Sequence, residues 1–461
     1  MRGSYDAFLS SKFSSMPPSG ITDIPPLIAG LNPHQGALVR WSLRRGKSAI
    51  FAQTGLGKTR MELAWCDALH RVTGGDSLIL APLAVAAQTV REGMDVGIHV
   101  TLARTDSDIR PGVNIVNYER LHLIDTDRFN AVALDESSVI KHKDSRTFSQ
   151  LLEAFCKTPY RLSATATPAP NDWVELGTQA EFLGVCSRVE MLSEFFCHDG
   201  GETQVWRLKK HARVQFWQWV ATWGAMVRKP SDLGFDDTAY ILPPLTIHEH
   251  ICGTDAQPAP GMLFNMEANT MMERRQARRD SLAQRVKACA DMVNADDEMW
   301  LVWCDLNPES EALAREIDGA VEVRGSDSTE YKEESLQAFA EGRIRVLVSK
   351  PSIAGWGLNF QSCARMAFVG VTDSYEAQYQ AIRRCWRFGQ KRPVDVHLFA
   401  SELEGAVLAN LKRKELEAEI MGAELSAMVG AVVRSEVLGM SRNTNAYNAR
   451  SPVSVPSFLR M

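Results

Sequence analysis

A glycine-containing turn near the start of the chain constrains its fold more than any other feature. Residues 48–51 (Ser-Ala-Ile-Phe) predict a short buried strand, and residues 61–65 (Met-Glu-Leu-Ala-Trp) predict a helix. The turn between them, Ala52–Thr59, ends in Gly-Lys-Thr. A strand, a glycine turn and a helix in this order are the context of a phosphate-binding loop, where backbone N–H groups and a helix N-terminus attract phosphate oxygens. The alternative interpretation is a glycine-rich turn without a ligand.

The end of this turn carries the chemistry expected of a nucleotide site. Lys58 is expected to reach the β- and γ-phosphates of ATP, and the Thr59 hydroxyl is expected to ligate Mg²⁺. Ala52 stands where the strict pattern has glycine, so the motif departs from that pattern by one methyl group. The residues predicted to contact ATP around the turn are Thr54, Gly55, Leu56, Gly57, Lys58, Thr59 and Arg60.

Apolar strand-like segments alternate with helical segments in two halves of the chain. Strands are predicted at 77–82, 114–118, 131–134 and from residue 160, and then at 300–303, 321–323, 345–349 and 366–369. This alternation predicts an α/β fold with parallel sheets that are covered on both faces. The second half begins near Leu245 and has no phosphate-binding loop of its own.

An acidic pair, Asp135-Glu136, directly follows one of the predicted strands of the first half. The carboxyl ends of parallel strands are where such a sheet presents its ligand site. We expect Asp135 to hold Mg²⁺ and Glu136 to orient and deprotonate an attacking water. Alone, the pair would be interpreted as a solvated turn. The loop upstream on the same sheet favours the catalytic interpretation, because metal and water must lie near Lys58.

Two arginines in the second half suggest that it completes the site of the first. Residues 380–390 predict a helix that ends at Gly389, with Arg384 and Arg387 three positions apart on one face. A half without its own phosphate loop can donate such arginines to a neighbouring γ-phosphate. The alternative is a surface pair that binds carboxylates.

Two other segments between these motifs have a structural and a functional interpretation. Phe216, Trp219, Val220 and Trp223 have the spacing of a packed helix face, which we favour over contact with nucleic-acid bases. Residues 271–293 predict one long helix that carries several arginines. We expect a solvated face there, with contact to a phosphate backbone as the alternative.

Composition limits the remaining possibilities. The formal net charge of −5 is not that of a strongly basic nucleic-acid-binding chain, although a local basic groove suffices for phosphate contacts. The nine cysteines are scattered and odd in number, which favours reduced thiols and a cytoplasmic protein, or host cytoplasm for a viral one. No apolar run approaches the roughly 20 residues of a membrane helix, so no membrane contact is expected.

In this order the motifs resemble those of superfamily-two helicases. Within that superfamily the chain is similar to Swi/Snf-type duplex translocases and to compact bacteriophage or prokaryotic relatives. The resemblance implies two RecA-like lobes, with ATP and Mg²⁺ bound in the cleft between them. It makes Ala52 the usual residue of the loop and Arg387 the arginine finger. Gln35 would read adenine, although the alternative of a helix-capping glutamine stays open.

The resemblance also assigns residues outside the ATP-binding turn. Gly355 would lie at the ATP site in the second lobe. Ser163, Ala164 and Thr165 would couple hydrolysis to movement. Contacts to nucleic acid would come from Pro82, Asn117, Tyr118, Arg324 and Gly325. The acidic box reads Asp-Glu-Ser-Ser, which lacks a residue that often bridges to the coupling segment and makes that coupling less certain.

The resemblance implies an ATP-dependent translocase or helicase, a DNA-dependent ATP hydrolase, with double-stranded DNA as its partner. The alternatives are a strand-separating or branch-migrating helicase on DNA or RNA, and an ATP-switched binding protein with little turnover. A monomer is expected, with a C-terminal tail that docks a protein partner. The predicted division is an arm at 1–30, an ATP-binding lobe at 31–185, a helical, aromatic-rich extension and interlobe linker at 186–244, a second lobe at 245–405, and a C-terminal helix and tail at 406–461.

Overall fold

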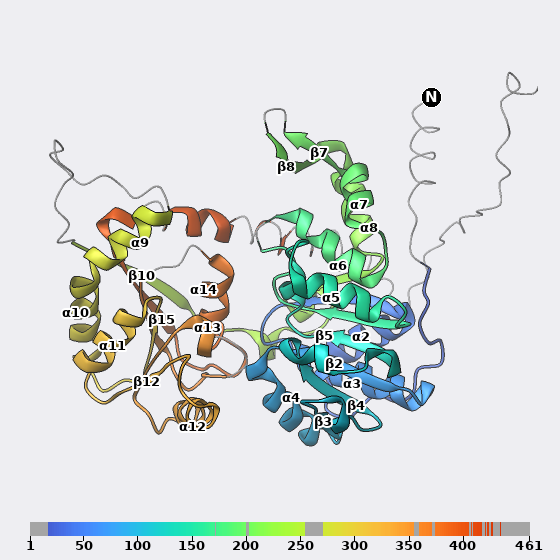
Figure 1. The fold of residues 1–461 in the computed structure, drawn as a ribbon, viewed down its shortest axis with the longest axis horizontal. Helices are drawn as coiled ribbons and strands as arrows, with labels where there is room; N and C mark the ends of the chain where they lie inside the picture. The colour runs from blue at the N-terminus through green and yellow to red at the C-terminus, as the bar shows by residue number, and fades with distance from the viewer. Residues whose placement is uncertain are drawn as a thin grey trace, which may run out of the picture.

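The computed structural model contains two α/β lobes that lie side by side, the first toward the right of Figure 1 and the second toward the left. It describes residues 17–170, 172–199, 202–253, 271–354, 359–370 and 374–404, together with 407, 409–416, 420, 422–423, 426 and 434. Each lobe is built on its own sheet, and every strand pairing within these two sheets is parallel. The predicted α/β fold, with two lobes built on parallel sheets, is therefore confirmed.

The first sheet has seven strands in the order β3-β4-β2-β5-β6-β1-β9. Its strands are β1 (Lys47–Ala52), β2 (Asp76–Ala81), β3 (Val100–Leu102), β4 (Val113–Asn117), β5 (Phe129–Leu134), β6 (Tyr160–Ala164) and β9 (Gly224–Val227). The main helices are α2 (Pro33–Arg45), α3 (Lys58–Thr73), α4 (Leu83–Asp95), α5 (Arg146–Phe155) and α6 (Leu176–Leu183). Because β1 and β5 run parallel in the same sheet, their carboxyl ends bring the phosphate loop and the acidic pair to one edge.

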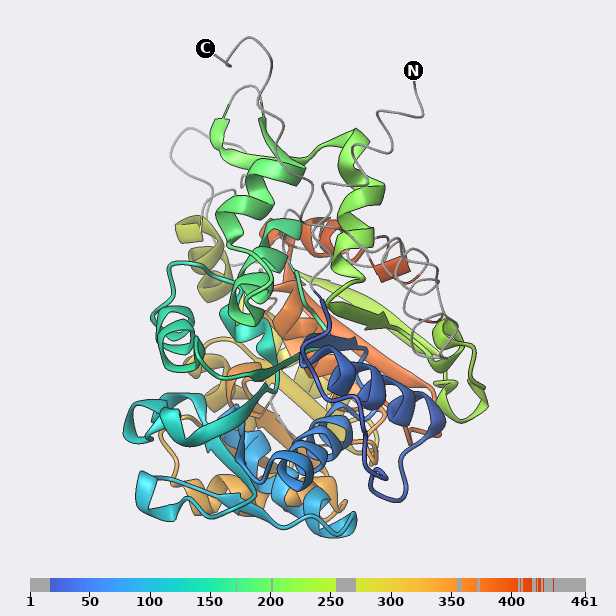
Figure 2. The ribbon, with the colours of Figure 1, turned by 90° about the vertical axis from the view of Figure 1, so that its right-hand side faces the viewer.

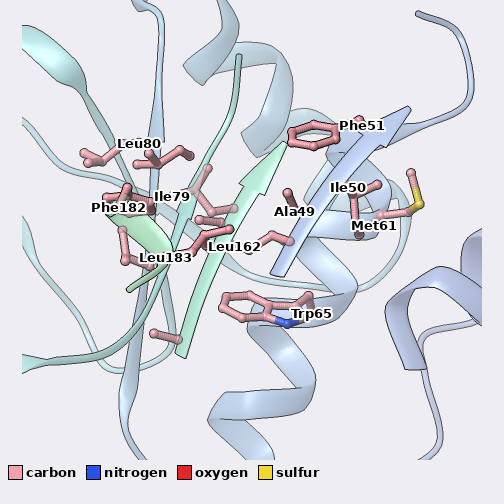
Figure 3. Close-up of a cluster of buried hydrophobic side chains, with 14 of the residues drawn as sticks. Ala49, Ile50, Phe51, Met61, Trp65, Ile79, Leu80, Leu162, Phe182 and Leu183 are labelled. Atoms are coloured by element: carbon pink, nitrogen blue, oxygen red, sulfur yellow. The ribbon is translucent and has the colours of Figure 1, made fainter. Parts of the chain in front are cut away.

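The strands of the first sheet read as continuous apolar runs because helices cover both faces. Figure 3 shows Ala49, Ile50 and Phe51 of β1 within a cluster that includes Met61 and Trp65 of α3. All five side chains are 1% exposed or less. Burial of one large apolar side chain stabilises a fold by about 1.5–3 kcal/mol, so this cluster holds the loop between β1 and α3 on a rigid base.

The second sheet has six strands in the order β10-β15-β14-β11-β13-β12. Its strands are β10 (Leu245–Cys252), β11 (Trp300–Cys304), β12 (Ala320–Val323), β13 (Val346–Ser349), β14 (Arg365–Val369) and β15 (Val394–Ser401). The helices around it are α9 (Met271–Asp280), α10 (Leu282–Val293), α11 (Asn307–Glu316), α12 (Thr329–Ala340), α13 (Pro351–Ala354) and α14 (Tyr375–Ile382).

An extension rises from the first lobe between α6 and β9, as Figure 2 shows in green. It consists of α7 (Arg188–Phe195), a hairpin of β7 (Phe196–Asp199) and β8 (Glu202–Leu208), and α8 (Arg213–Val220). Phe216, Val220 and Trp223 are 1% exposed or less. The prediction that this aromatic stripe packs in a core is confirmed.

The first lobe reaches further along the chain than its predicted end at residue 185. Met226 and Val227 were predicted to belong to the linker, but they lie in β9, which pairs with β1. Ala225 and Val227 are fully buried, so the strand closes the core of the first lobe. The connection to the second lobe therefore follows β9 and ends where β10 begins.

The long helix predicted at 271–293 is two helices, α9 and α10, which meet at Ser281. Arg278 and Arg285 were predicted to lie on a solvated or phosphate-binding face, and both are instead buried. Arg278 pairs with Glu404 at 2.8 Å, and Arg285 pairs with Glu309 at 2.8 Å. Buried charges require such partners, so these two arginines form ion pairs within the second lobe.

Candidate active site between the two lobes

The turn between β1 and α3 has the backbone of a ligand-binding loop. Gly55 and Gly57 adopt φ angles of 93° and 82°, which residues with a side chain rarely adopt. A Cβ atom on Gly57 would lie 2.2 Å from the Gln35 side-chain nitrogen. Both glycines are therefore required by the conformation and by the close approach of neighbouring groups.

Polar groups of this turn are available for an anion. The Lys58 ammonium donates to the Ala52 carbonyl at 3.2 Å, and the Thr54 hydroxyl is buried without a hydrogen-bond partner among the described residues. Thr59 follows Lys58 at the start of the 16-residue helix α3, whose first N–H groups point out of the helix. These groups fit a polyphosphate, and the Thr59 hydroxyl fits its metal ion.

Gln35 connects the turn to helix α2. Its side-chain oxygen accepts from the Asn32 N–H at 2.9 Å, which caps α2, and its nitrogen donates to the Leu56 carbonyl at 2.9 Å. The capping interpretation is therefore correct. One N–H and one lone pair of the amide are left over, so recognition of adenine stays a prediction.

The acidic pair lies at the end of β5, as predicted. Asp135 is 4% exposed, and its pKa is raised to about 7, first by burial and then by the Glu136 carboxylate, while Lys58 opposes the rise. A cation beside Asp135 would favour its ionised form, so the carboxylate fits a Mg²⁺ site. Glu136 has a φ of 49°, the one positive φ outside glycine among the described residues. This uncommon conformation is stabilised where the Glu136 N–H donates to Asp135 Oδ1 at 2.9 Å.

The predicted coupling segment, Ser163 to Thr165, lies at the end of β6, the strand between β5 and β1. The Thr165 hydroxyl donates to Glu136 Oε2 at 3.4 Å, and the Thr165 N–H donates to the Ile50 carbonyl of β1 at 3.3 Å. Ser163 and Ala164 are buried in the strand itself. The segment therefore touches both the strand before the phosphate loop and the residue predicted to activate water.

The second lobe brings its two predicted arginines to this site. Arg384 is 6% exposed, and burial lowers its pKa while Glu136 and Asp135 act in the opposite direction. Arg387 donates to Asn359, and burial, with a smaller contribution from Arg384, lowers its pKa to about 10. Arg387 therefore remains charged at neutral pH.

The turn that carries these arginines lies over the phosphate loop. A Cβ atom on Gly55 would lie 3.2 Å from the backbone nitrogen of Phe388. The predicted helix at 380–390 ends early, at Ile382, and the arginines follow in turns. Arg384 and Arg387 both reach the phosphate loop because the chain after α14 bends toward the first lobe. Helical spacing is not the reason.

A cavity of about 1480 Å³ lies between the lobes and reaches Glu136. Four of the residues predicted to contact nucleic acid line it, namely Pro82, Asn117, Tyr118 and Gly325. Its wall also carries basic side chains, Arg91, Arg104, Arg120, Lys141, Arg146 and Lys332. The fifth predicted residue, Arg324, pairs instead with Glu311 and Glu322 of its own lobe. Gly355 lies outside the described residues.

One comparison with known proteins falls in the second lobe. The family model described as Helicase conserved C-terminal domain matches residues 284–389. This part of the second lobe is thus similar to a helicase C-terminal domain. It starts within α10 and ends at Gly389, so it includes both Arg384 and Arg387.

Whole proteins were also compared with this chain. The chain is 33% identical over 94 residues to the bifunctional helicase and thymine dioxygenase JBP2 of Leishmania tarentolae, and equally to that of Leishmania major. The match covers 20% of this chain and spans only 9% of those relatives. The SWI2/SNF2 ATPase core of Sulfolobus solfataricus, solved in complex with dsDNA, is 18% identical, with a TM-score of 0.42 over 88% of this chain and 96% of that one.

Several residues near the site were not singled out by the sequence. Glu62 of α3 is 1% exposed, and neither of its carboxylate oxygens has a hydrogen-bond partner among the described residues. Burial and then Asp135 raise its pKa well above the usual range. Arg383 of the second lobe lies over the Trp386 ring at 4.3 Å. In the orientation that satisfies both ends of its amide, Gln53 accepts from Arg383 at 2.7 Å and donates to the Arg228 carbonyl.

The raised pKa of Asp135 predicts a pH-dependent cost in stability. Between the ordinary value of about 4 and the folded value of about 7, the folded protein holds a proton that the unfolded chain has lost. Stability without Mg²⁺ should therefore fall as pH rises through this window. Asp135→Asn should melt about 2 °C or more above the parent at pH 8, and this gain should shrink toward pH 5. Melting curves of the metal-free proteins test this, and parallel curves at all pH values would contradict it.

Proposed function

We propose that this chain is an ATP-dependent translocase that moves on nucleic acid, with duplex DNA as its track. The observation that carries the proposal is the convergence of two sets of groups on one cleft. The phosphate loop and the Asp135-Glu136 pair come from the first lobe, and Arg384 and Arg387 come from the helicase C-terminal domain. An ATP site split in this way makes hydrolysis depend on how the lobes are arranged.

The residues have distinct roles in this proposal. Lys58 and the N–H groups of the loop bind the phosphates, and Glu136 orients and deprotonates the attacking water. Thr59 and Asp135 would hold Mg²⁺, which supplies positive charge beside the phosphates. Arg384 and Arg387 stabilise the charge that develops on the γ-phosphate, an interaction made fully only in the transition state.

Nucleic acid would occupy the cavity that ends at Glu136. Its wall carries six basic side chains and five glutamates, Glu119, Glu136, Glu330, Glu333 and Glu376. The basic side chains would bind the phosphate backbone, so binding should be salt-dependent and weakly sequence-dependent. The Thr165 contact to Glu136 offers a route by which occupation of this cavity reaches the water-activating residue. If the lobes close and open with each ATP, each cycle becomes one step along the track.

The deciding experiment measures ATP turnover with no nucleic acid, with duplex DNA, with single-stranded DNA and with RNA. We expect duplex DNA to raise kcat the most, and the half-saturating DNA concentration to rise steeply with salt. Equal rates with and without every nucleic acid would contradict the motor and favour an ATP switch with little turnover. Preference for a forked substrate, with strand displacement, would favour a strand-separating helicase.

We further infer that the protein acts as a monomer. Its proposed location is the cytoplasm, which for a bacteriophage protein is the cytoplasm of the host. No helix among the described residues is long and apolar enough to cross a membrane. The C-terminal segment proposed to dock a partner lies largely outside those residues. Light scattering of the protein, with and without residues 435–461 and with DNA present, tests the monomer.

A further inference from the structure

One ion pair between the lobes lies on the wall of the cavity proposed for nucleic acid. Lys141 of the first lobe pairs with Glu376 of the second, and both residues line the cavity. The side chain of Glu376 is 9% exposed and that of Lys141 is 20% exposed. The pair is thus largely shielded from water, and separating it would leave two poorly solvated charges.

The same carboxylate makes a second contact to the first lobe. The Thr167 hydroxyl donates to the other oxygen of Glu376 at 3.3 Å. Both oxygens of Glu376 are therefore bound by the first lobe, although Glu376 itself belongs to the first turn of α14. A carboxylate in that position is also stabilised by the helix N-terminus, which fixes its place in the second lobe.

These contacts lead directly to the residue predicted to activate water. The Thr167 N–H donates to the Thr165 hydroxyl at 3.2 Å, and that hydroxyl donates to Glu136 at 3.4 Å. Lys141 ends the short turn that starts just after Glu136. Glu376 is therefore connected to Glu136 by two routes, through Thr167 and Thr165 and through Lys141 with the backbone of this turn.

The other end of α14 leads to the arginines of the ATP site. The helix begins with Glu376 in its first turn and ends at Ile382, and Arg384 follows two residues later. A helix of eight residues is a rigid element, so a shift of Glu376 also displaces the turn that carries Arg384. One carboxylate thus connects the position of the water-activating residue to that of the opposing arginines.

We propose that Glu376 is a positioning residue that couples occupation of the interlobe cavity by nucleic acid to ATP hydrolysis. The inference rests on the function proposed above. Backbone phosphates that enter the cavity meet Lys141 and compete with Glu376 for it. The carboxylate then moves relative to Thr167, and the movement changes the alignment of Glu136 with Arg384. We call Glu376, with its partners Lys141 and Thr167, the interlobe latch. In this proposal the latch takes the place of the bridging side chain that the Asp-Glu-Ser-Ser box lacks.

The test compares the factor by which duplex DNA raises kcat in the parent and in Glu376→Gln. Glutamine keeps the shape of the side chain but removes the charge that holds Lys141. We expect this factor to fall by about 5- to 150-fold, the usual range of coupling between two sites. The matched control is Glu298→Gln, which removes an exposed ion pair with Arg392 in the same lobe. The control should keep the parental factor.

Two contradicting outcomes are distinguishable. A parent that DNA does not stimulate contradicts the proposed function itself. A stimulated parent with equal stimulation in Glu376→Gln overturns the latch and leaves the function intact. If Glu376→Gln melts at a lower temperature than the parent, Thr167→Val is judged instead by the same ratio. That variant removes one hydroxyl from the first lobe and leaves the ion pair in place.

Discussion

Arg387→Ala should hydrolyse ATP about 10³- to 10⁵-fold more slowly than the parent, while it binds ATP almost as tightly. The reason is that a guanidinium aimed at the γ-phosphate acts mainly on charge that develops in the transition state. Because Arg387 hydrogen-bonds Asn359 within the second lobe, its removal should leave the first lobe unchanged. Single-turnover hydrolysis and equilibrium binding of ATP measure the two effects separately.

Two further variants show whether this effect belongs to Arg387. Arg384→Ala should also slow hydrolysis. The carboxylates of Glu136 and Asp135 raise the pKa of Arg384, which shows that its guanidinium lies in the field of the acidic pair. They are not among the main influences on the pKa of Arg387. Arg392→Ala removes a surface arginine of the same lobe and should have the parental rate. If Arg387→Ala only weakens DNA binding and hydrolyses ATP normally, its assignment to the ATP site is wrong.

Lys58→Ala should abolish ATP turnover with the fold retained. The ammonium is half-buried, and its hydrogen bond to the Ala52 carbonyl lies in the loop, outside the apolar cluster of the first lobe. A single hydrogen bond of this kind contributes only about 0.5–1.5 kcal/mol to stability, so the melting temperature should change little. The loss of a charge that binds the β- and γ-phosphates should weaken ATP binding as well as hydrolysis.

Arg71→Ala is the matched control for this variant. Arg71 lies on the same helix, α3, and forms a partly exposed ion pair with Asp67 at 2.7 Å. Its removal tests whether loss of positive charge on α3 alone affects turnover, and we expect the parental rate. A normal turnover number in Lys58→Ala would contradict the assignment of the whole nucleotide site.

The sequence predicted the parts of the fold that are set by local pattern. The apolar runs of β1 and β5 could be recognised because strands buried on both faces have no polar alternation. The short β9 could not, since Gly224–Val227 follows an aromatic helix and pairs with β1 across about 170 intervening residues. Arg278 and Arg285 were misjudged for a similar reason, because their partners Glu404 and Glu309 are distant in sequence.

The candidate site divides in the same way. Lys58, Asp135 and Glu136 were predicted because each belongs to a short motif with a fixed position after a strand. Glu376 was missed because nothing beside it in the sequence reveals that Lys141 and Thr167 will bind it. Glu62 lies four residues after Lys58, on the same helical face, and that spacing was a signal that could have indicated it.

The position of β9 has a consequence for how the protein is made. Strand β1 lies between β6 and β9, so one of its edges stays unpaired until residues 224–227 have left the ribosome. At about 5–20 residues per second, that wait lasts many seconds after the phosphate loop has been synthesised. An open strand edge can pair with other chains, so nascent chains that stall before residue 227 should be prone to aggregate.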